Sequence, residues 1–266
     1  MDLQLKGKRA LVTGGSRGIG LAIARQLARE GASVAIAARD PAALEAAARA
    51  LSDEVGTKVA FAAGDTGDDA SARAMVETAA AALGGLDILV NSAARPAGET
   101  PPPKLAGVTG SLLWEEVNVK VMGYIRCAQA AAPYMIAQGW GRIVNISGLN
   151  ARSAGALVGS VRNVAVSAMT KNLADELGPH GINVTVVHPG MTRTERMGPM
   201  LARRAEALGI GVEEMEKRMT AQTVIGRMVD AGEVADIVAF LASPRSVAIT
   251  GDAIACGGGV KGPIYY

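Results

Sequence analysis

The chain has few aromatic residues and few cysteines. Aromatic side chains make up 3% of its 266 residues, so a core must be built mostly from Ala, Val, Leu, Ile and Met. The two cysteines, Cys127 and Cys256, are far apart and show no metal-ligand spacing. This usage gives no reason to expect a metal site and favours a reduced, cytoplasmic protein.

The chain also has no block of like charge and no long apolar run. Its formal net charge is +2, and lysine and arginine are scattered along it, which argues against a nucleic-acid partner. Residues 1–9 contain no apolar signal core, so we expect no secretion. No apolar run approaches the ~20 residues that span a bilayer, so we expect no membrane partner.

What the sequence does contain is an alternation of short apolar runs with segments of helical period. The apolar runs predict strands at 10–12, 34–37, 59–62, 88–90, 142–146, 183–187 and 253–256. The periodic segments predict helices at 21–30, 42–51, 70–83, 113–138, 164–177 and 233–242. Such alternation is typical of a doubly wound, Rossmann-like α/β fold, a parallel sheet with helices on both faces. We therefore expect residues 1–266 to form a single domain.

Two segments break this alternation. Residues 95–110 are rich in proline and glycine, whereas residues 191–226 are long, rich in methionine and charge, and helical in composition. Both would leave the carboxyl ends of strands, where ligands bind in open α/β sheets. We interpret 191–226 as a substrate lid over a hydrophobic small molecule; the alternatives are that both segments are surface loops, and that the methionines belong to a core.

A glycine-rich loop follows the first predicted strand and begins the first predicted helix. In it, Gly14 permits a tight turn, Gly18 lets the backbone approach a pyrophosphate, and Gly20 lets helix and strand pack closely. The helix N-terminus then offers free N–H groups to a phosphate. The sequence therefore predicts a nucleotide site in this loop, formed by Gly14, Ser16, Arg17, Gly18, Ile19 and Gly20.

The end of the second predicted strand favours NADP(H) over NAD(H). Enzymes that use NAD place an acidic residue there to bind the ribose hydroxyls, whereas this chain has Arg39. A guanidinium could bind a 2′-phosphate through two hydrogen bonds, and Arg17 could assist. The next residue, Asp40, is better interpreted as a helix cap because Pro41 follows it.

The spacing Gly14-x-x-x-Gly18-x-Gly20 resembles the short-chain dehydrogenase/reductase family over nearly the whole chain. Further matches are Asp65, Asn91-Ser92-Ala93-Ala94, Asn118, Asn145-Ile146-Ser147, Pro189-Gly190-Met191-Thr192-Arg193-Thr194, Ile249-Thr250-Gly251 and Gly257-Gly258. The resemblance implies an oxidoreductase that transfers hydride between NADP(H) and a carbonyl or alcohol substrate. It also implies a homotetramer.

The same resemblance implies further cofactor contacts. Asp65, with Thr66, would bind the adenine, and Asn91, with Ala93, would support the ribose region. The turn after the sixth predicted strand would hold the carboxamide and pyrophosphate through Pro189, Gly190, Thr192 and Thr194.

The proton-donor motif of the family is missing. The family places Tyr-x-x-x-Lys at the start of the helix that runs on to Lys171. These two positions are Gly159 and Asn163 here. Moving the register by one residue gives Ser160 and Val164, so neither alignment recovers the pair. Asn163 could bind a ribose hydroxyl but carries no charge to lower the pKa of a neighbour.

Three further residues are candidates for the chemical centre. Asn118 matches the asparagine that holds a water relay in the family, although such a residue also serves structure. Ser147 is the remaining serine at the end of its strand, where it could bind the carbonyl or only cap the strand. Arg162 could stabilise an oxyanion or bind a carboxylate, or lie at the surface or a subunit interface.

These observations leave two functions open. One is an oxidoreductase with an atypical proton donor, such as water held by Asn118 and Ser147; loss of a positioned acid slows proton transfer by ~10²–10⁴-fold without forbidding hydride transfer. The other is a catalytically silent nucleotide-binding sensor or partner subunit. A tyrosine supplied by a neighbouring subunit, Tyr265 or Tyr266, is a further hypothesis, and His188 is expected to be a packed residue rather than a base.

Overall fold

A seven-stranded parallel sheet forms the centre of the protein. The computed structural model describes residues 1–95 and 102–261. The strands of the sheet are β1 (Arg9–Thr13), β2 (Ser33–Ala38), β3 (Ala60–Ala63), β4 (Ile88–Asn91), β5 (Gly141–Ile146), β6 (Ile182–Pro189) and β9 (Ala253–Cys256). Their order is β3-β2-β1-β4-β5-β6-β9, and every neighbouring pair is parallel. This order confirms the doubly wound α/β fold, in which ligands bind where the strand order reverses.

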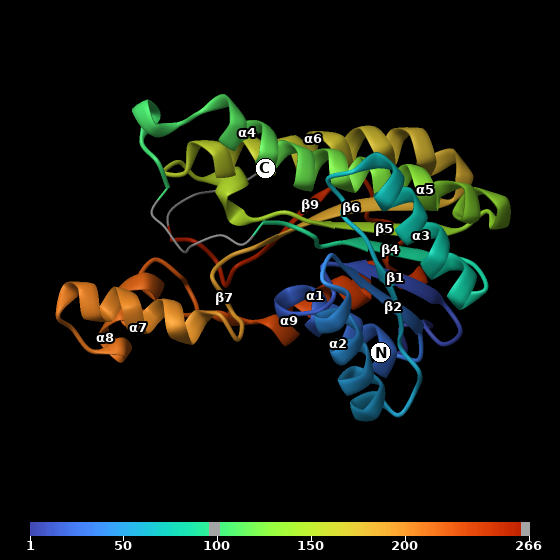
Figure 1. Cartoon of the computed structure of the whole chain (residues 1–266), viewed down its shortest axis with the longest axis horizontal. Helices are drawn as coiled ribbons and strands as arrows, with labels where there is room; N and C mark the ends of the chain where they lie inside the picture. Colours follow the sequence, from blue (N-terminus) through green and yellow to red (C-terminus); the bar gives the residue numbers. More distant parts are fainter. Residues whose placement is uncertain (96–101, 262–266) are drawn as a thin grey trace.

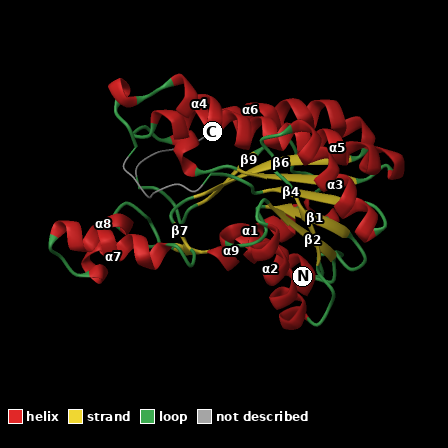
Figure 2. Ribbon diagram, viewed as in Figure 1, coloured by secondary structure: helices red, strands yellow, loops and turns green. Residues whose placement is uncertain are grey.

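Helices cover both faces of the sheet (Figures 1 and 2). One face carries α1 (Gly18–Arg29), α2 (Pro41–Val55) and α9 (Ala231–Leu241), and the other carries α3 (Asp69–Leu83), α4 (Gly110–Glu116), α5 (Gly123–Gln138) and α6 (Leu157–Leu177). Short 3-10 turns lie at Leu105–Gly107, Leu149–Arg152, Gly178–His180 and Pro244–Ser246. No helix in the described residues is long and apolar enough to cross a membrane.

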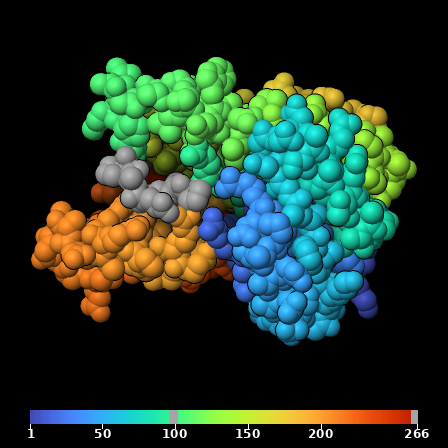
Figure 3. Space-filling view, viewed as in Figure 1, coloured from blue at the N-terminus to red at the C-terminus, as the bar shows by residue number. Residues whose placement is uncertain are grey.

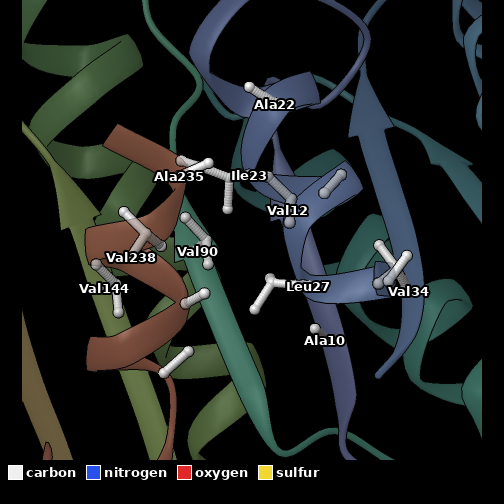
Figure 4. Packing of buried hydrophobic residues seen from close by; sticks show 14 of the residues in the cluster. Ala10, Val12, Ala22, Ile23, Leu27, Val34, Val90, Val144, Ala235 and Val238 are labelled. Carbon is white, nitrogen blue, oxygen red and sulfur yellow. The ribbon is translucent and has the colours of Figure 1, made fainter. Parts of the chain in front are cut away.

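The strands are apolar throughout because both of their faces are buried. On one face, Val12 and Val90 of the sheet pack against Ile23 and Leu27 of α1 and Val238 of α9 (Figure 4). These five side chains are fully buried. The low aromatic content is therefore compatible with a closed core, in which aliphatic side chains fill the space between sheet and helix.

The long helix expected at 113–138 is interrupted by a π-helical turn. The turn spans Val117–Met122, between α4 and α5. A π-turn inserts one extra residue into the helical repeat, and such insertions are frequent at functional sites. Here the turn buries the side chains of Lys120 and Val121. The helix expected at 164–177 also begins earlier than predicted, at Leu157, so that both Gly159 and Asn163 lie within α6.

Residues 191–226 form a separate projection beyond the carboxyl ends of the strands (Figures 1 and 3). It contains α7 (Met197–Leu208) and α8 (Val212–Thr220), and it is joined to the body through the paired strands β7 (Thr192–Arg193) and β8 (Val229–Asp230). Leu201, Ala205 and Met215 of the projection form a small apolar cluster with Met228, which lies just beyond it. At least some of the methionines thus serve as packing residues of the projection itself.

Candidate active site

A cavity of about 520 Å³ opens at the carboxyl ends of the central strands. The glycine loop after β1, the end of β2 and the loops after β3 and β4 form most of its wall. The π-turn, the end of β5 and the segment after β7 complete it. The lining residues are Thr13, Gly14, Ser16, Arg17, Gly18, Ile19, Gly20, Ala37, Ala38, Arg39, Asp40, Ala43, Gly64, Thr66, Met75, Ser92, Ala93, Ala94, Val119, Lys120, Ile146, Ser147, Thr194, Glu195 and Arg196.

The glycine loop has the backbone geometry that the sequence predicted. Gly14 has φ +67°, and a Cβ there would lie 2.8 Å from the carbonyl oxygen of Ser92. A Cβ on Gly20 would lie 2.3 Å from the carbonyl oxygen of Gly14. In contrast, a Cβ on Gly18 would meet nothing closer than 3.8 Å. Two glycines therefore let chain segments pack closely, while Gly18 keeps open space beside the N-terminus of α1, where a phosphate fits.

Two arginines provide positive charge along this part of the cavity. Arg17 and Arg39 both line it, and both are exposed. The carboxylate beside Arg39 is already used, because Asp40 caps α2 and accepts hydrogen bonds from the backbone N–H groups of Ala42 and Ala43 at 3.0 and 3.1 Å. The interpretation of Asp40 as a helix cap is confirmed. A phosphate near Arg39 would thus find a guanidinium donor, and the neighbouring Asp40 carboxylate would already be bound to backbone N–H groups.

The residues expected to contact the cofactor fall into two groups. Ten of them line the cavity: Gly14, Ser16, Arg17, Gly18, Ile19, Gly20, Arg39, Thr66, Ala93 and Thr194. Five others are not among the described residues that line it: Asp65, Asn91, Pro189, Gly190 and Thr192. Those in the second group shape the loops that carry the first.

Hydrogen bonds show how this second group acts. Asn91 is fully buried and donates to Oδ1 of Asn145 at 2.9 Å, which joins the ends of β4 and β5. Asp65 accepts a hydrogen bond from the backbone N–H of Gly67 at 2.8 Å and closes its own turn. Thr192 donates to the carbonyl of Gly190 at 3.1 Å. Each bond fixes the backbone of a loop at the edge of the cavity.

Asn118 lies next to the lining residues Val119 and Lys120 but is not itself one of the described residues that line the cavity. Its Nδ2 donates to the carbonyl oxygen of Gly67 at 2.8 Å, and its own carbonyl accepts from Arg126 at 3.1 Å. The side chain thus ties the π-turn to the loop after β3. This contact agrees with the structural alternative for Asn118, while its role in a water relay stays a prediction.

Ser147 lies in the cavity wall at the end of β5. Its hydroxyl donates to the main-chain carbonyl of Asn163 at 3.1 Å, and 9% of the residue is exposed. The following residue, Gly148, faces the side chain of Asn163. A Cβ on Gly148 would lie 3.0 Å from Nδ2 of Asn163. Asn163 and the lack of a side chain at Gly148 are therefore sterically matched.

The structure encloses Arg162 in the protein interior. It is 8% exposed and forms an ion pair with Glu116 of α4. This pairing disagrees with the expectation of a surface arginine and keeps its guanidinium behind the cavity wall that the described residues form. Gly159, one turn earlier in α6, is partly exposed, and a Cβ there would meet only Nδ2 of Asn150 at 3.3 Å and the side chain of Ala156 at 3.5 Å.

The structure brings to this centre a residue that the sequence analysis did not select. Lys120, on the π-turn, is 4% exposed and lines the cavity. Its Nζ donates to the carbonyl oxygen of Ser147 at 3.0 Å and to Oδ1 of Asn163 at 3.2 Å. Burial lowers the pKa of this ammonium well below its ordinary value. The charge of Arg162 lowers that pKa further, whereas Glu116 acts in the opposite direction.

Two other titratable groups near the centre are held in one state. Burial, and then the charge of Arg152, lower the pKa of His188 to about 4, so this histidine is neutral and packed, as expected. Burial raises the pKa of Tyr124 far above the neutral range, and its hydroxyl donates to the carbonyl of Ile146 at 2.9 Å. Neither group can exchange a proton near pH 7. Tyr265 and Tyr266 lie outside the described residues.

Comparison with known proteins now gives this site a context. A family model described as enoyl-(acyl carrier protein) reductase matches residues 14–261. The chain belongs to the short-chain dehydrogenase/reductase family. It is 36% identical over 261 residues to an uncharacterized oxidoreductase of Methylorubrum extorquens, covering 97% of this chain and 99% of that one. It is 34% identical over 263 residues to a 3-oxoacyl-[acyl-carrier-protein] reductase of Aquifex aeolicus, covering 98% and 100%.

Solved structures agree with this assignment. L-sorbose reductase of Gluconobacter frateurii, solved in complex with NADPH and L-sorbose, superposes with a TM-score of 0.92. It shares 29% identity, over 99% of this chain and 100% of that one. The family members compared here are oxidoreductases, and this short-chain dehydrogenase/reductase is of the same type. The cavity described above lies where the doubly wound fold binds its dinucleotide.

Proposed function

We propose that this short-chain dehydrogenase/reductase is an NADP(H)-dependent carbonyl reductase whose proton donor is not the tyrosine of the family. When bound, NADPH would supply a hydride to the carbonyl carbon of a small substrate. The observation that carries the cofactor preference is the pair Arg17 and Arg39 on the cavity wall, beside an aspartate engaged in capping a helix. The NADPH and NADP complexes among its structural relatives support the same preference.

The residues of the chain have distinct tasks in this proposal. The N-terminus of α1 and the open space at Gly18 receive the pyrophosphate. Arg39 and Arg17 bind the 2′-phosphate, and Thr194 contributes from the segment after β7. Ser147, on the cavity wall, is available to orient a carbonyl oxygen, because its hydroxyl can turn from the Asn163 carbonyl and donate to the substrate instead.

The proton path must differ from that of the family. In our alignment, Gly159 occupies the place of the tyrosine and has no side chain. The tyrosine that approaches the end of β5 in the described structure, Tyr124, is buried and committed to a backbone carbonyl. The proposal therefore requires another group to deliver the proton.

Cofactor binding provides the first test. We expect purified protein to bind NADPH more tightly than NADH in calorimetric titrations. Arg39→Ala should weaken NADPH binding by about 10–100-fold, the value of one or two charge-assisted hydrogen bonds, and leave NADH binding unchanged. Arg49→Ala is the matched control, because Arg49 is an exposed arginine paired with Glu45 on α2. Equal loss of both cofactors in Arg39→Ala would refute the assignment of the 2′-phosphate site.

Turnover provides the second test. NADPH oxidation should be followed with a sugar ketone, a 3-oxoacyl thioester and a hydrophobic aliphatic ketone, which span the substrates named for relatives and the hydrophobic substrate expected from the sequence. Consumption with any of these supports a reductase. Tight NADPH binding without consumption would favour the alternative, a catalytically silent sensor or partner subunit.

A further inference from the structure

Lys120 has the environment of a proton-transfer group rather than that of a structural ion pair. A buried lysine normally pairs with a carboxylate, because an isolated buried charge is costly. Both acceptors that bind Lys120 Nζ are instead neutral, the Ser147 carbonyl and the Asn163 amide. The acid that acts on the pKa of Lys120, Glu116, pairs with Arg162. The ammonium is therefore held in place without a neutralising partner.

The hydrogen bonds of Lys120 fit both of its protonation states. An ammonium has three N–H donors and a neutral amine has two. The two acceptors use two N–H groups, and they can be satisfied whether the amine is charged or neutral. The third proton is the one that can leave. Because Lys120 and Ser147 both line the cavity, that proton and the serine hydroxyl lie at the same end of the ligand space.

The charged groups around Lys120 come from three packed elements. Glu116 of α4 favours the ammonium, while Arg162 of α6 disfavours it. His188 of β6 is neutral, since its pKa is lowered to about 4. Burial adds the largest effect and favours the neutral amine. Burial and Arg162 together lower the pKa of Lys120 from its ordinary value towards the working pH. A pKa near the working pH favours efficient acid catalysis.

Lys120 and Asn163 also form a compensating pair. In the family alignment a lysine would stand at Asn163, on α6. Here the positive charge comes instead from the π-turn of the neighbouring helix, and an amide accepts its hydrogen bond at 3.2 Å. Gly148 leaves the space that the Asn163 side chain needs, because a Cβ on Gly148 would lie 3.0 Å from Nδ2 of Asn163. One lysine remains at the site, supplied by a different segment of the chain.

We infer that Lys120 is the proton donor of this reductase, acting in place of the missing tyrosine; the inference rests on the proposed function. As the carbonyl carbon accepts the hydride supplied by NADPH, the carbonyl oxygen takes a proton from Lys120 Nζ. The N–H bond breaks, an O–H bond forms, and a neutral amine remains that regains its proton from water. One carbonyl, one NADPH and one proton give one alcohol and one NADP⁺.

The test compares Lys120→Met with Lys120→Arg. We expect Lys120→Met to lower kcat by about 10²–10⁴-fold, the contribution of a positioned acid. Lys120→Arg should lower kcat to a similar extent although it keeps the charge, because a guanidinium does not release its proton near neutral pH. Lys171→Met is the control, since Lys171 is exposed and paired with Asp175 on the surface of α6; it should retain wild-type kcat. Thermal melts and NADPH titration identify any variant that fails to fold.

The pH profile distinguishes a donor from a merely structural lysine. Reduction requires the ammonium, so wild-type kcat should fall as pH rises through the pKa of Lys120. Asn163→Asp would place a carboxylate against Nζ, raise that pKa and move the falling limb to higher pH. Lys120→Met should lose the limb altogether. A fold defect would lower kcat without moving the limb in this ordered way.

A direct titration gives a readout that does not depend on turnover. In protein labelled with ¹³C at the lysine ε-carbons, the signal absent from Lys120→Arg identifies Lys120. We expect this signal to titrate below the other lysines and to shift when NADPH is added. A signal that titrates normally and ignores NADPH would overturn the assignment, as would Lys120→Met with wild-type kcat; in the latter case the reductase function would stand. If the wild-type protein binds NADPH but reduces none of the carbonyls, both the donor role and the reductase function are overturned.

Discussion

Restoring the family lysine at Asn163 should destabilise this protein. Asn163→Lys would place a second ammonium next to Lys120, whose Nζ lies 3.2 Å from the present Oδ1. The substitution also removes one of the two neutral acceptors of Lys120. Both partners are buried, at 3% and 4% exposure, so water can screen the repulsion only weakly.

The size of the effect follows from two limits. Two unit charges 4 Å apart at an effective dielectric constant of 20 repel by about 4 kcal/mol. The protein can avoid that cost by releasing one proton, which costs about 1.4 kcal/mol for each unit by which the pKa must fall below its ordinary value. Since burial has already lowered the pKa of Lys120, neutralisation is the cheaper route. We therefore expect Asn163→Lys to lose about 2–4 kcal/mol of unfolding free energy at pH 7, including the lost hydrogen bond.

Urea unfolding at several pH values measures this effect. The unfolded chain would bind more protons than the folded one at neutral pH, because the two lysines titrate normally once they are separated. The stability of Asn163→Lys should therefore rise with pH towards the ordinary lysine pKa, and its deficit relative to wild type should shrink. Asn172→Lys, the same substitution on the exposed face of α6, should change stability by no more than about 0.5 kcal/mol.

A swapped variant sharpens the result. Lys120→Asn combined with Asn163→Lys restores one cation and one amide, and it should be more stable than Asn163→Lys alone. If Asn163→Lys is as stable as wild type at pH 7, or if its deficit grows with pH, the reasoning about repulsion between two lysines at this site is wrong.

Two further predictions concern the cofactor loop and the base of the sheet. Gly20→Ala would force a Cβ to within 2.3 Å of the Gly14 carbonyl oxygen and should weaken NADPH binding at least tenfold, as measured by fluorescence titration. Gly110→Ala is the control, because a Cβ there meets nothing within 4 Å, and it should leave NADPH binding unchanged. Equal NADPH affinity of the two variants would contradict the packing role of Gly20. Burial tends to raise the pKa of Asp87, but hydrogen bonds from Arg9 lower it overall, so the stability from this pair is present above the ordinary aspartate pKa and is lost as pH falls through the lowered value. Asp87→Asn should lower the free energy of unfolding by about 2–3 kcal/mol at neutral pH. This is less than for a fully buried ion pair, because the Arg9 side chain is 27% exposed. A variant that is as stable as wild type in urea at pH 7 would show that the ion pair does not contribute to stability.

Much of the fold could be predicted because its signals are local. The strands and helices follow from short apolar runs and helical periodicity, and the cap at Asp40 follows from one aspartate before one proline. The spacing of Gly14, Gly18 and Gly20 likewise marks the turn between β1 and α1. Gly20 packs against the Gly14 carbonyl six residues earlier, which is a local constraint, whereas the close contact of Gly14 with Ser92 comes from the tertiary structure.

The chemical centre could be predicted only in part. Ser147 was identified from its place at the end of a strand, and the structure does put it on the cavity wall. Lys120 was missed, although a single lysine between Val119 and Val121 was a signal that could have drawn attention to it. Nothing in a regular helical period indicated that this lysine faces inward, because the π-turn at Val117–Met122 changes which side chains face the sheet.

The sequence by itself determined the fold class and the glycine-rich turn after the first strand, because these depend on residue type and short spacing. The absence of the family's tyrosine and lysine stays a prediction from the resemblance. Only the tertiary structure decided which residues surround Gly159 and Asn163. Lys120 and Asn163 are 43 residues apart in the sequence. They meet because the segment from α4 to α5, which contains the π-turn, and α6 follow the neighbouring strands β4 and β5 and lie on the same face of the sheet. A contact of that kind depends on how two helices pack, and no local pattern records it.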